Sequence, residues 1–281
     1  MNMNHCKTFS ALGDYLKEQA ARTDLKQAEC KQLYGTLEER CQRHYLNGLL
    51  SGHRNWYICE GTSAVFTYLY RNWSYQSSLK ANRDYLVEIA NHLQRDYYCA
   101  DGPQITVQEI THILSILDKR YDFSKKVLGD ALLYLLLPND AHRTYDALCR
   151  PYATPDGQWT CDIILPHIQR DTKTNPGSIL LHELGHLLNL KLTGSLLVLP
   201  ELFVQLDSLM RTTQTAGSTE ELSELFAHLF AMTMLRQPEL KQYDSYPPLP
   251  EETQAVFAAY FQTLLAAMQP SRTPFIGAIF E

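Results

Sequence analysis

Apolar positions recur at helical spacing through most of the N-terminal half of the chain. From residue 9 to about residue 50 they repeat every three or four residues between Glu, Lys, Arg and Gln, which predicts two helices with a break near residues 23–26. Similar patterns predict a helix capped by Ser77 or Ser78, a helix over 106–121 and a helix over 124–137. The sequence therefore predicts a mainly helical region over residues 1–145.

The pattern changes near residues 138–155, where prolines and turn residues gather and where we expect a domain boundary. The β-branched residues that follow predict a strand over about 160–168. Within it, Pro166 indicates either an edge strand or a strand end. As an edge strand, this segment could align an extended peptide.

Three helices are predicted after this strand. The first has Asn175 as N-cap, Pro176 at its first position and Gly194 past its end. Two more are expected over 218–236, capped by Ser218, and over 250–268. Residues 146–281 therefore form the second expected domain, and the fold class is α+β but mainly helical.

The first of these helices carries the segment HELGH, which places three titratable side chains in an apolar run. His182 and His186 are four residues apart, so they share one helix face and can bind one ion, while Glu183 lies about 100° round the helix. Zinc binds imidazole and lowers the pKa of its bound water to about 7, and a neighbouring carboxylate can take the proton. HExxH on a helix therefore predicts zinc-dependent hydrolysis, with a peptide or protein as the substrate.

A catalytic zinc site needs a third protein ligand. A third histidine at the spacing HExxHxxGxxH is absent, because Asn189 and Leu192 stand at the relevant positions. On the next predicted helix, Glu220 and Glu224 are four apart and share a face, so one could bind the metal and the other could accept a hydrogen bond nearby. Two acidic residues at shorter spacing are further candidates, Glu201 and Asp207.

HELGH together with the downstream segment ELFAHLF resembles the zinc endopeptidases related to anthrax lethal factor, a group of gluzincin type. In that family a glutamate that opens an EFFAEAF-like helix completes the HExxH site. The resemblance covers about residues 155–265 and includes the later segments RQPELKQ and PEETQAVFAAYF. It implies a zincin-like catalytic domain with a small sheet, preceded by the helical N-terminal region. It also implies His182 and His186 as zinc ligands, Glu183 as general base and Glu224 as third ligand, with Glu220 as the alternative.

The chain departs from the family pattern at two positions. The family has an acidic residue four positions after the ligand glutamate, where this chain has His228, although Glu220 as ligand would put Glu224 there. The family also has a tyrosine seven positions before that glutamate, which stabilises the tetrahedral intermediate. Here the position is Gly217, or Thr213 in the other register. Three residues are candidates for the missing role: Tyr243, Tyr246 and His228.

The amino-acid composition argues against two classes of binding partner. The chain has 281 residues, 45% of them hydrophobic, and a formal net charge of −6 without a block of Lys or Arg. These features argue against a nucleic-acid or membrane partner. The seven cysteines include no CxxC pair, which is typical of reduced thiols, and no signal peptide or membrane span is recognisable. We therefore expect a cytoplasmic protein, with export by a specialised secretion system as the alternative.

Two alternatives to an active peptidase are consistent with the sequence. One is a catalytically inactive zincin-fold protein with a binding or regulatory role, which the missing tyrosine favours. The other is a metal-free helical interaction scaffold, which would hold no zinc and lose no stability on chelation. The sequence does not indicate an oligomeric state.

Overall fold

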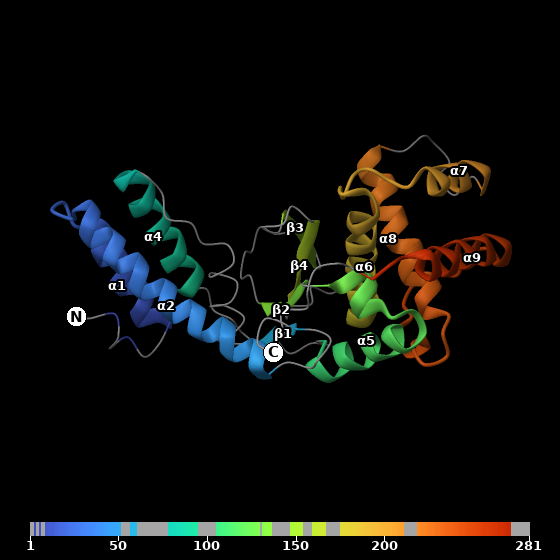
Figure 1. Cartoon of the computed structure of the whole chain (residues 1–281), viewed down its shortest axis with the longest axis horizontal. Helices are drawn as coiled ribbons and strands as arrows, with labels where there is room; N and C mark the ends of the chain where they lie inside the picture. The colour runs from blue at the N-terminus through green and yellow to red at the C-terminus, as the bar shows by residue number, and fades with distance from the viewer. Residues whose placement is uncertain are drawn as a thin grey trace. The chain divides into compact units, whose positions relative to one another are not determined.

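Helices account for most of the described residues, and one small sheet accompanies them in the computed structural model (Figure 1). The structure describes residues 3, 6, 9–51, 57–60, 78–94, 105–129, 131–136, 147–153, 159–166, 175–210 and 218–270. The fold class is therefore α+β and mainly helical, as the sequence predicts.

Contacts within the chain divide it into two units, and the last crossing from the first to the second lies between residues 143 and 144, while the second unit also includes residues 53–58 and 99–134. The first unit contains helices α1 (Phe9–Ala21), α2 (Gln27–Ser51) and α4 (Leu79–Gln94). The second contains everything from residue 144 onward and also helix α5 (Val107–Tyr121), which precedes the expected boundary.

The first unit packs its helices around leucine side chains. The predicted break between the first two helices is confirmed, since α1 ends at Ala21 and α2 begins at Gln27. Its core includes Leu12, Leu16, Leu37 and Leu86, which are all fully buried. The hydroxyl of Tyr34 on α2 donates a 3.0 Å hydrogen bond to the carbonyl of Asn82, which ties α2 to α4. Ser78 caps α4 by accepting a hydrogen bond from the backbone of Ala81.

The sheet has four strands in the order β1-β2-β4-β3. These are β1 (Tyr57–Glu60), β2 (Leu132–Leu136), β3 (Leu148–Ala153) and β4 (Trp159–Pro166). Strands β3 and β4 are antiparallel, with Leu148 opposite Ile164 and Ala153 opposite Trp159. Strand β3 therefore forms one edge of the described sheet, and β4 lies inside it.

Two predictions about this region are wrong. The predicted helix over 124–137 is instead the short π-helix η2 (Ser124–Leu128) followed by strand β2. The expectation of an edge strand over 160–168 also fails, because β4 pairs on both sides. Pro166 is the last described residue of β4, and the residues from 167 to 174 lie outside the described part of the chain, so the other expectation, a strand end at Pro166, stays a prediction.

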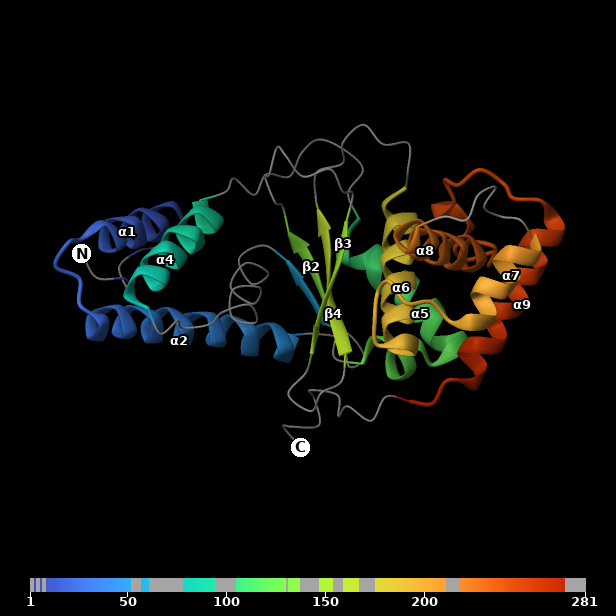
Figure 2. The same cartoon turned by 90° about the horizontal axis from the view of Figure 1, so that it is seen from above.

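Helix α6 (Pro176–Thr193) lies between the sheet and helix α8 (Thr219–Leu235), as Figure 2 shows. Its predicted caps are confirmed: the Asn175 side chain accepts a hydrogen bond from the backbone of Gly177, and Gly194 ends the helix in the left-handed conformation. Leucines on several sides of α6 are fully buried, as expected of a helix covered by two layers. Residues at its centre are therefore held by neighbours on both faces.

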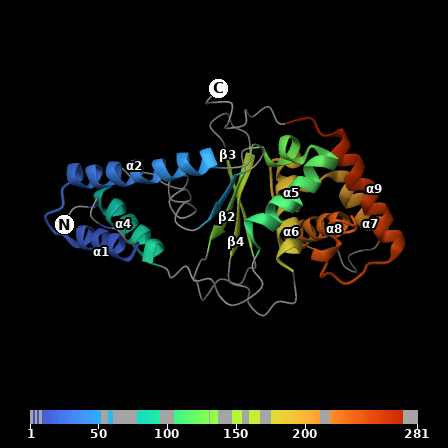
Figure 3. The ribbon, with the colours of Figure 1, turned by 90° about the horizontal axis from the view of Figure 1, so that it is seen from below.

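The remaining helices complete the second unit. Figure 3 shows α5 beside α6. Helix α7 (Glu201–Met210) was not predicted, whereas α8 and α9 (Glu251–Ala267) match the predicted segments. Aromatic rings from these three helices form one buried cluster: Phe203, Phe226, Phe230, Phe257, Tyr260 and Phe261. No helix among the described residues is long and apolar enough to cross a membrane.

Gly185 sets the closest approach of α6 to α8, and its substitution should destabilise the fold. A Cβ atom at this position would lie 2.7 Å from the Cα of Ala227 and 3.0 Å from its carbonyl oxygen. Because backbone atoms cannot move aside, Gly185→Ala must push the helices apart. We expect the free energy of unfolding to fall by about 1–3 kcal/mol in urea denaturation.

Gly35→Ala in α2 is the matched control for this prediction. A Cβ atom there meets nothing within 4 Å. Alanine is the better helix former, so this change should raise stability by up to about 1 kcal/mol. An unchanged or higher stability for Gly185→Ala would show that α6 and α8 are not packed as described.

Candidate metal centre

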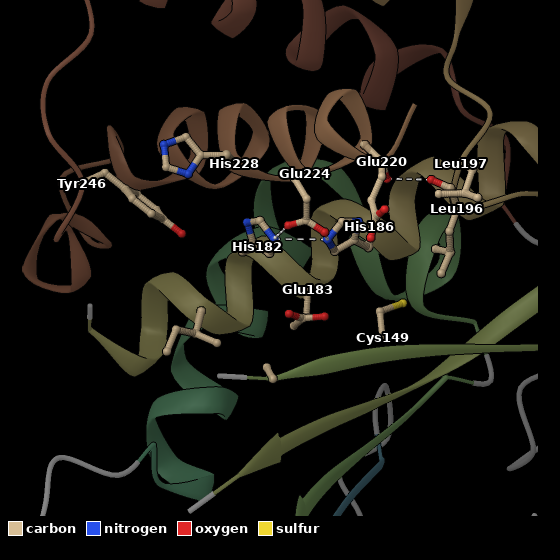
Figure 4. A pocket seen from close by; sticks show the side chains of 13 residues that line it. Cys149, His182, Glu183, His186, Leu196, Leu197, Glu220, Glu224, His228 and Tyr246 are labelled. Atoms are coloured by element: carbon tan, nitrogen blue, oxygen red, sulfur yellow. Dashed lines mark hydrogen bonds and ion pairs between the residues drawn. The ribbon is translucent and has the colours of Figure 1, made fainter. Parts of the chain in front are cut away.

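Three side chains from two helices converge on one point. The Nε2 atoms of His182 and His186 on α6 lie 3.1 Å apart. The carboxylate of Glu224 on α8 faces both, with its oxygens 3.0 Å from the Nε2 of His182 and 3.3 Å from that of His186. Figure 4 shows the three groups pointing toward one another across the space between the helices.

The spacing of these atoms fits a zinc site. Ligand atoms about 2.0–2.1 Å from a tetrahedral zinc ion lie roughly 3.3 Å from each other. The observed separations of 3.0, 3.1 and 3.3 Å are close to this value. Two imidazoles and one carboxylate are also the ligand set of many catalytic zinc sites, in which a fourth position stays open. The residues present therefore fit the metal.

The sequence explains why these groups meet. Histidines four residues apart share one face of α6. Gly185 packs against Ala227, and because both residues are small, α8 can lie close to α6. Glu224 lies in the second turn of α8, whose start is fixed by a capping box between Ser218 and Glu221. The position of the carboxylate is thus determined by the helix start and by close helix packing.

Glu183 lies beside this group but points toward the sheet (Figure 4). Its side chain is buried, with the residue only 6% exposed. Burial raises the pKa of its carboxyl group, which the charges of His186 and His182 oppose, and a hydrogen bond from the backbone of Cys149 also lowers it. A carboxylate with a raised pKa is a stronger base than an exposed one.

The charges of the cluster are mutually stabilising. Hydrogen bonds from His182 and then His186 hold the pKa of Glu224 far below its usual range, although partial burial opposes this. Burial acts to lower the pKa of His186, but the hydrogen bond to Glu224 and the charges of Glu183 and Glu224 raise it overall. The cluster therefore keeps Glu224 ionised, as a metal ligand must be.

A cleft of about 520 Å³ opens onto the three groups. Tyr246 and His228 lie at one end of it, and Leu196 and Leu197 lie at the other (Figure 4). The rings of Tyr246 and His228 meet edge to face with centroids 4.2 Å apart. Burial raises the pKa of Tyr246, so its hydroxyl stays protonated and can donate a hydrogen bond. Among the described residues that line the cleft, none is Lys or Arg.

The other candidate residues predicted from the sequence do not join the convergent group. Glu220 lines the cleft but does not belong to the convergent group. Glu201 is exposed on α7 and accepts a hydrogen bond from Gln205, and Asp207 is buried on the same helix; neither joins the group. Tyr243 is not among the residues that line the cleft. Gly217 and Thr213 lie outside the described residues.

Asn189 shapes the apolar end of the cleft, a role that the sequence did not reveal. Its side-chain amide donates to the carbonyls of Ser195, Leu196 and Val198 at 3.0–3.2 Å. The hydroxyl of Ser223 on α8 donates a 2.6 Å hydrogen bond to the same carbonyl of Leu196. These bonds hold the segment after α6 against the cleft. The only local signal in the sequence is a polar residue, Asn189, within the apolar run of this helix.

The chain has no significant match among protein-family models, curated proteins or solved structures. The chemistry of the centre is therefore inferred from its own residues.

Proposed function

We propose that this protein is a zinc-dependent metallopeptidase that hydrolyses peptide bonds. The observation that carries the proposal is the convergence of His182, His186 and Glu224 with ligand spacing, beside a buried Glu183 in the same cleft. A helix that bears HExxH, packed between a small sheet and a helix that supplies a glutamate, supports a zincin-like catalytic domain of gluzincin type. Glu224 is then the third ligand in preference to Glu220.

The two histidines and Glu224 would hold the metal. Bound zinc lowers the pKa of water to about 7 and polarises a carbonyl group. Glu224 stays ionised in this cluster, and the His182 and His186 rings already present their Nε2 atoms to one point. The protein therefore supplies a nearly preformed site, which reduces the reorganisation needed on binding.

Glu183 serves as the general base in this mechanism. Its carboxylate takes a proton from the attacking water and passes it to the leaving amine. The raised pKa suits both steps, because the group must accept a proton and then release it near neutral pH. The backbone of Cys149, on the sheet side of the cleft, limits the rise of the pKa of this carboxylate.

Tyr246 is our candidate donor for the carbonyl oxygen as negative charge develops on it, and its hydroxyl would then leave the long, 3.4 Å hydrogen bond that it donates to the carbonyl of Ser178. It lines the cleft and stays protonated. His228 packs against its ring, and burial lowers the pKa of His228, so we assign this residue to positioning. The extended substrate would align along the edge strand β3, because its residue Cys149 and the preceding Ala147 line the cleft.

A peptide library tests the proposal. The zinc-loaded protein is incubated with a mixture of peptides, and new termini are identified by mass spectrometry. We expect cleavage that stops with a zinc chelator and returns on adding zinc. Absence of cleavage over a broad library with zinc bound would favour the inactive zincin-fold alternative, and absence of bound zinc would favour the scaffold.

A further inference from the structure

Two buried cysteines face each other under the metal centre. Their sulfur atoms, from Cys149 on β3 and Cys161 on β4, lie 2.9 Å apart. Non-bonded carbon atoms rest at about 3.5–4.0 Å, and sulfur is larger than carbon, so this is an unusually close contact. Cys161 is completely buried, whereas Cys149 also lines the cleft. One thiol of the pair is therefore reachable from the cleft.

We propose that Cys149 and Cys161 form a reversible disulfide, and that this modification site controls the position of strand β3 beside Glu183. The oxidant is a low-molecular-weight disulfide such as oxidised glutathione. The hydrogen bond with Cys161 and burial raise the pKa of the Cys149 thiol, so the reaction is faster at alkaline pH. The thiolate of Cys149 attacks the oxidant, which forms a mixed disulfide and releases one thiol. The thiolate of Cys161 then attacks the Cys149 sulfur and releases the second thiol. Two protein thiols are thus oxidised, one disulfide is reduced to two thiols, and the protons pass to the released thiolates.

The strand register shows what must move when the bond closes. Cys149 is opposite Ile163, and Cys161 is opposite Pro151, so the two cysteines are diagonal neighbours. Diagonal positions in antiparallel strands are about 7–8 Å apart between Cα atoms, whereas a disulfide usually spans 4.4–6.8 Å. The sulfurs must also approach from 2.9 Å to about 2.05 Å. Closure therefore draws the two strands together at this point.

Strand β3, rather than β4, is the strand that can move when the disulfide forms. Both strands contact α6, but β3 is the edge strand of the described sheet and pairs only with β4, whereas β4 pairs on both sides. Cys149 and Glu183 line the same cleft, and the backbone of Cys149 lowers the pKa of the Glu183 carboxyl group. A shift of β3 toward Cys161 therefore moves the partner of Glu183. Strand β3 therefore has one position beside the cleft when the two cysteines are reduced and another when they form a disulfide.

Disulfide mapping on the wild-type protein tests the modification site. The protein is exposed to oxidised glutathione, its free thiols are blocked with N-ethylmaleimide, and it is cleaved on the N-terminal side of aspartate. This cleavage yields fragments 146–155 and 156–161, each with one of the two cysteines. We expect these fragments to appear linked, with the mass of the pair reduced by two hydrogen atoms. Recovery of both as maleimide adducts, or of Cys149 joined only to glutathione, would overturn the proposal.

The variant Cys161→Ala should stop the reaction at the mixed disulfide, so fragment 146–155 should carry glutathione. This mapping does not depend on hydrolysis, so its outcome is independent of the proposed peptidase function.

The expected effect of the disulfide on peptide hydrolysis does rest on that function. A displacement of a reacting group by about 1 Å can lower the reaction rate by up to about 10²-fold. We therefore expect the rate of peptide hydrolysis to fall by about ten- to 100-fold on oxidation. Reduction with dithiothreitol should restore the rate. Full linkage with unchanged hydrolysis would show that β3 does not act on Glu183.

Discussion

Glu183→Gln is expected to abolish most of the peptide hydrolysis while leaving zinc binding intact. A general base contributes typically 10²–10⁴-fold to the rate, so kcat/KM should fall by about that factor. Glutamine has nearly the same size and can still accept the hydrogen bond from the backbone of Cys149. It cannot accept a proton from water. The measurement is kcat/KM on a cleaved peptide, together with zinc content per chain.

Glu252→Gln is a matched control on a different helix. Glu252 is exposed in the first turn of α9, away from the residues that line the cleft. Its kcat/KM should equal that of the wild type. If Glu183→Gln kept full activity, the role of Glu183 as general base would be wrong. If it lost both zinc and activity, Glu183 would be needed for the site itself rather than for the proton transfer.

Glu224→Gln should weaken zinc binding far more than Glu220→Gln. Loss of groups that merely orient a ligand costs 10–100-fold in metal affinity, so loss of a charged ligand should cost at least about 100-fold. Glu224 contacts both histidines, at 3.0 and 3.3 Å, whereas Glu220 is one helix turn away and outside the convergent group. Competition with a chromogenic zinc chelator measures the two affinities.

Thermal unfolding provides a second measurement on the same pair of variants. Zinc at about 1,000 times its dissociation constant stabilises the folded state by about 4 kcal/mol. We expect a zinc-dependent rise in Tm for the wild type and for Glu220→Gln, and a much smaller rise for Glu224→Gln. If the zinc-dependent rise in Tm were instead smaller for Glu220→Gln, Glu220 would be the zinc ligand and Glu224 the acidic residue four positions after it.

Local signals in the sequence predicted the helices that carry the centre. The caps of α6, Asn175 and Gly194, stand at its two ends, and Ser218 begins the capping box of α8. Capping interactions lie within a few residues, so a single sequence reveals them. A capping box also begins α5 at Thr106, and it too lies within a short segment, TVQE.

Elements that depend on distant contacts were predicted less well. The apolar run at β2 has no clear period, and pairing with β4 decides that it is a strand rather than a helix. Helix α7 does carry apolar residues at helical spacing, at Leu202, Phe203, Leu206 and Leu209, but it leaves Leu202 and Leu209 exposed. The N-cap signals of α6 and α8 have no counterpart before it, so spacing was the only local sign of this helix. Strand β2, in contrast, could not be identified from local spacing.

The sequence indicated the candidate metal centre more fully than the cleft around it. HELGH specifies three residues by spacing within one helix, but the choice between Glu220 and Glu224 depends on how α8 rotates against α6. The contact between Cys149 and Cys161 depends on the register of β3 and β4, which their sequences do not specify. Tyr246 reaches the cleft through the fold of the segment after α8, and no motif marks it.

Zinc content per chain is the most direct test of the central claim. The purified protein is reconstituted with zinc, dialysed against metal-free buffer and analysed by atomic emission together with protein concentration. The convergence of His182, His186 and Glu224 predicts about one zinc ion per chain, and less in His186→Ala. Wild-type protein that retains no zinc would contradict the metal centre and, with it, the proposed peptidase.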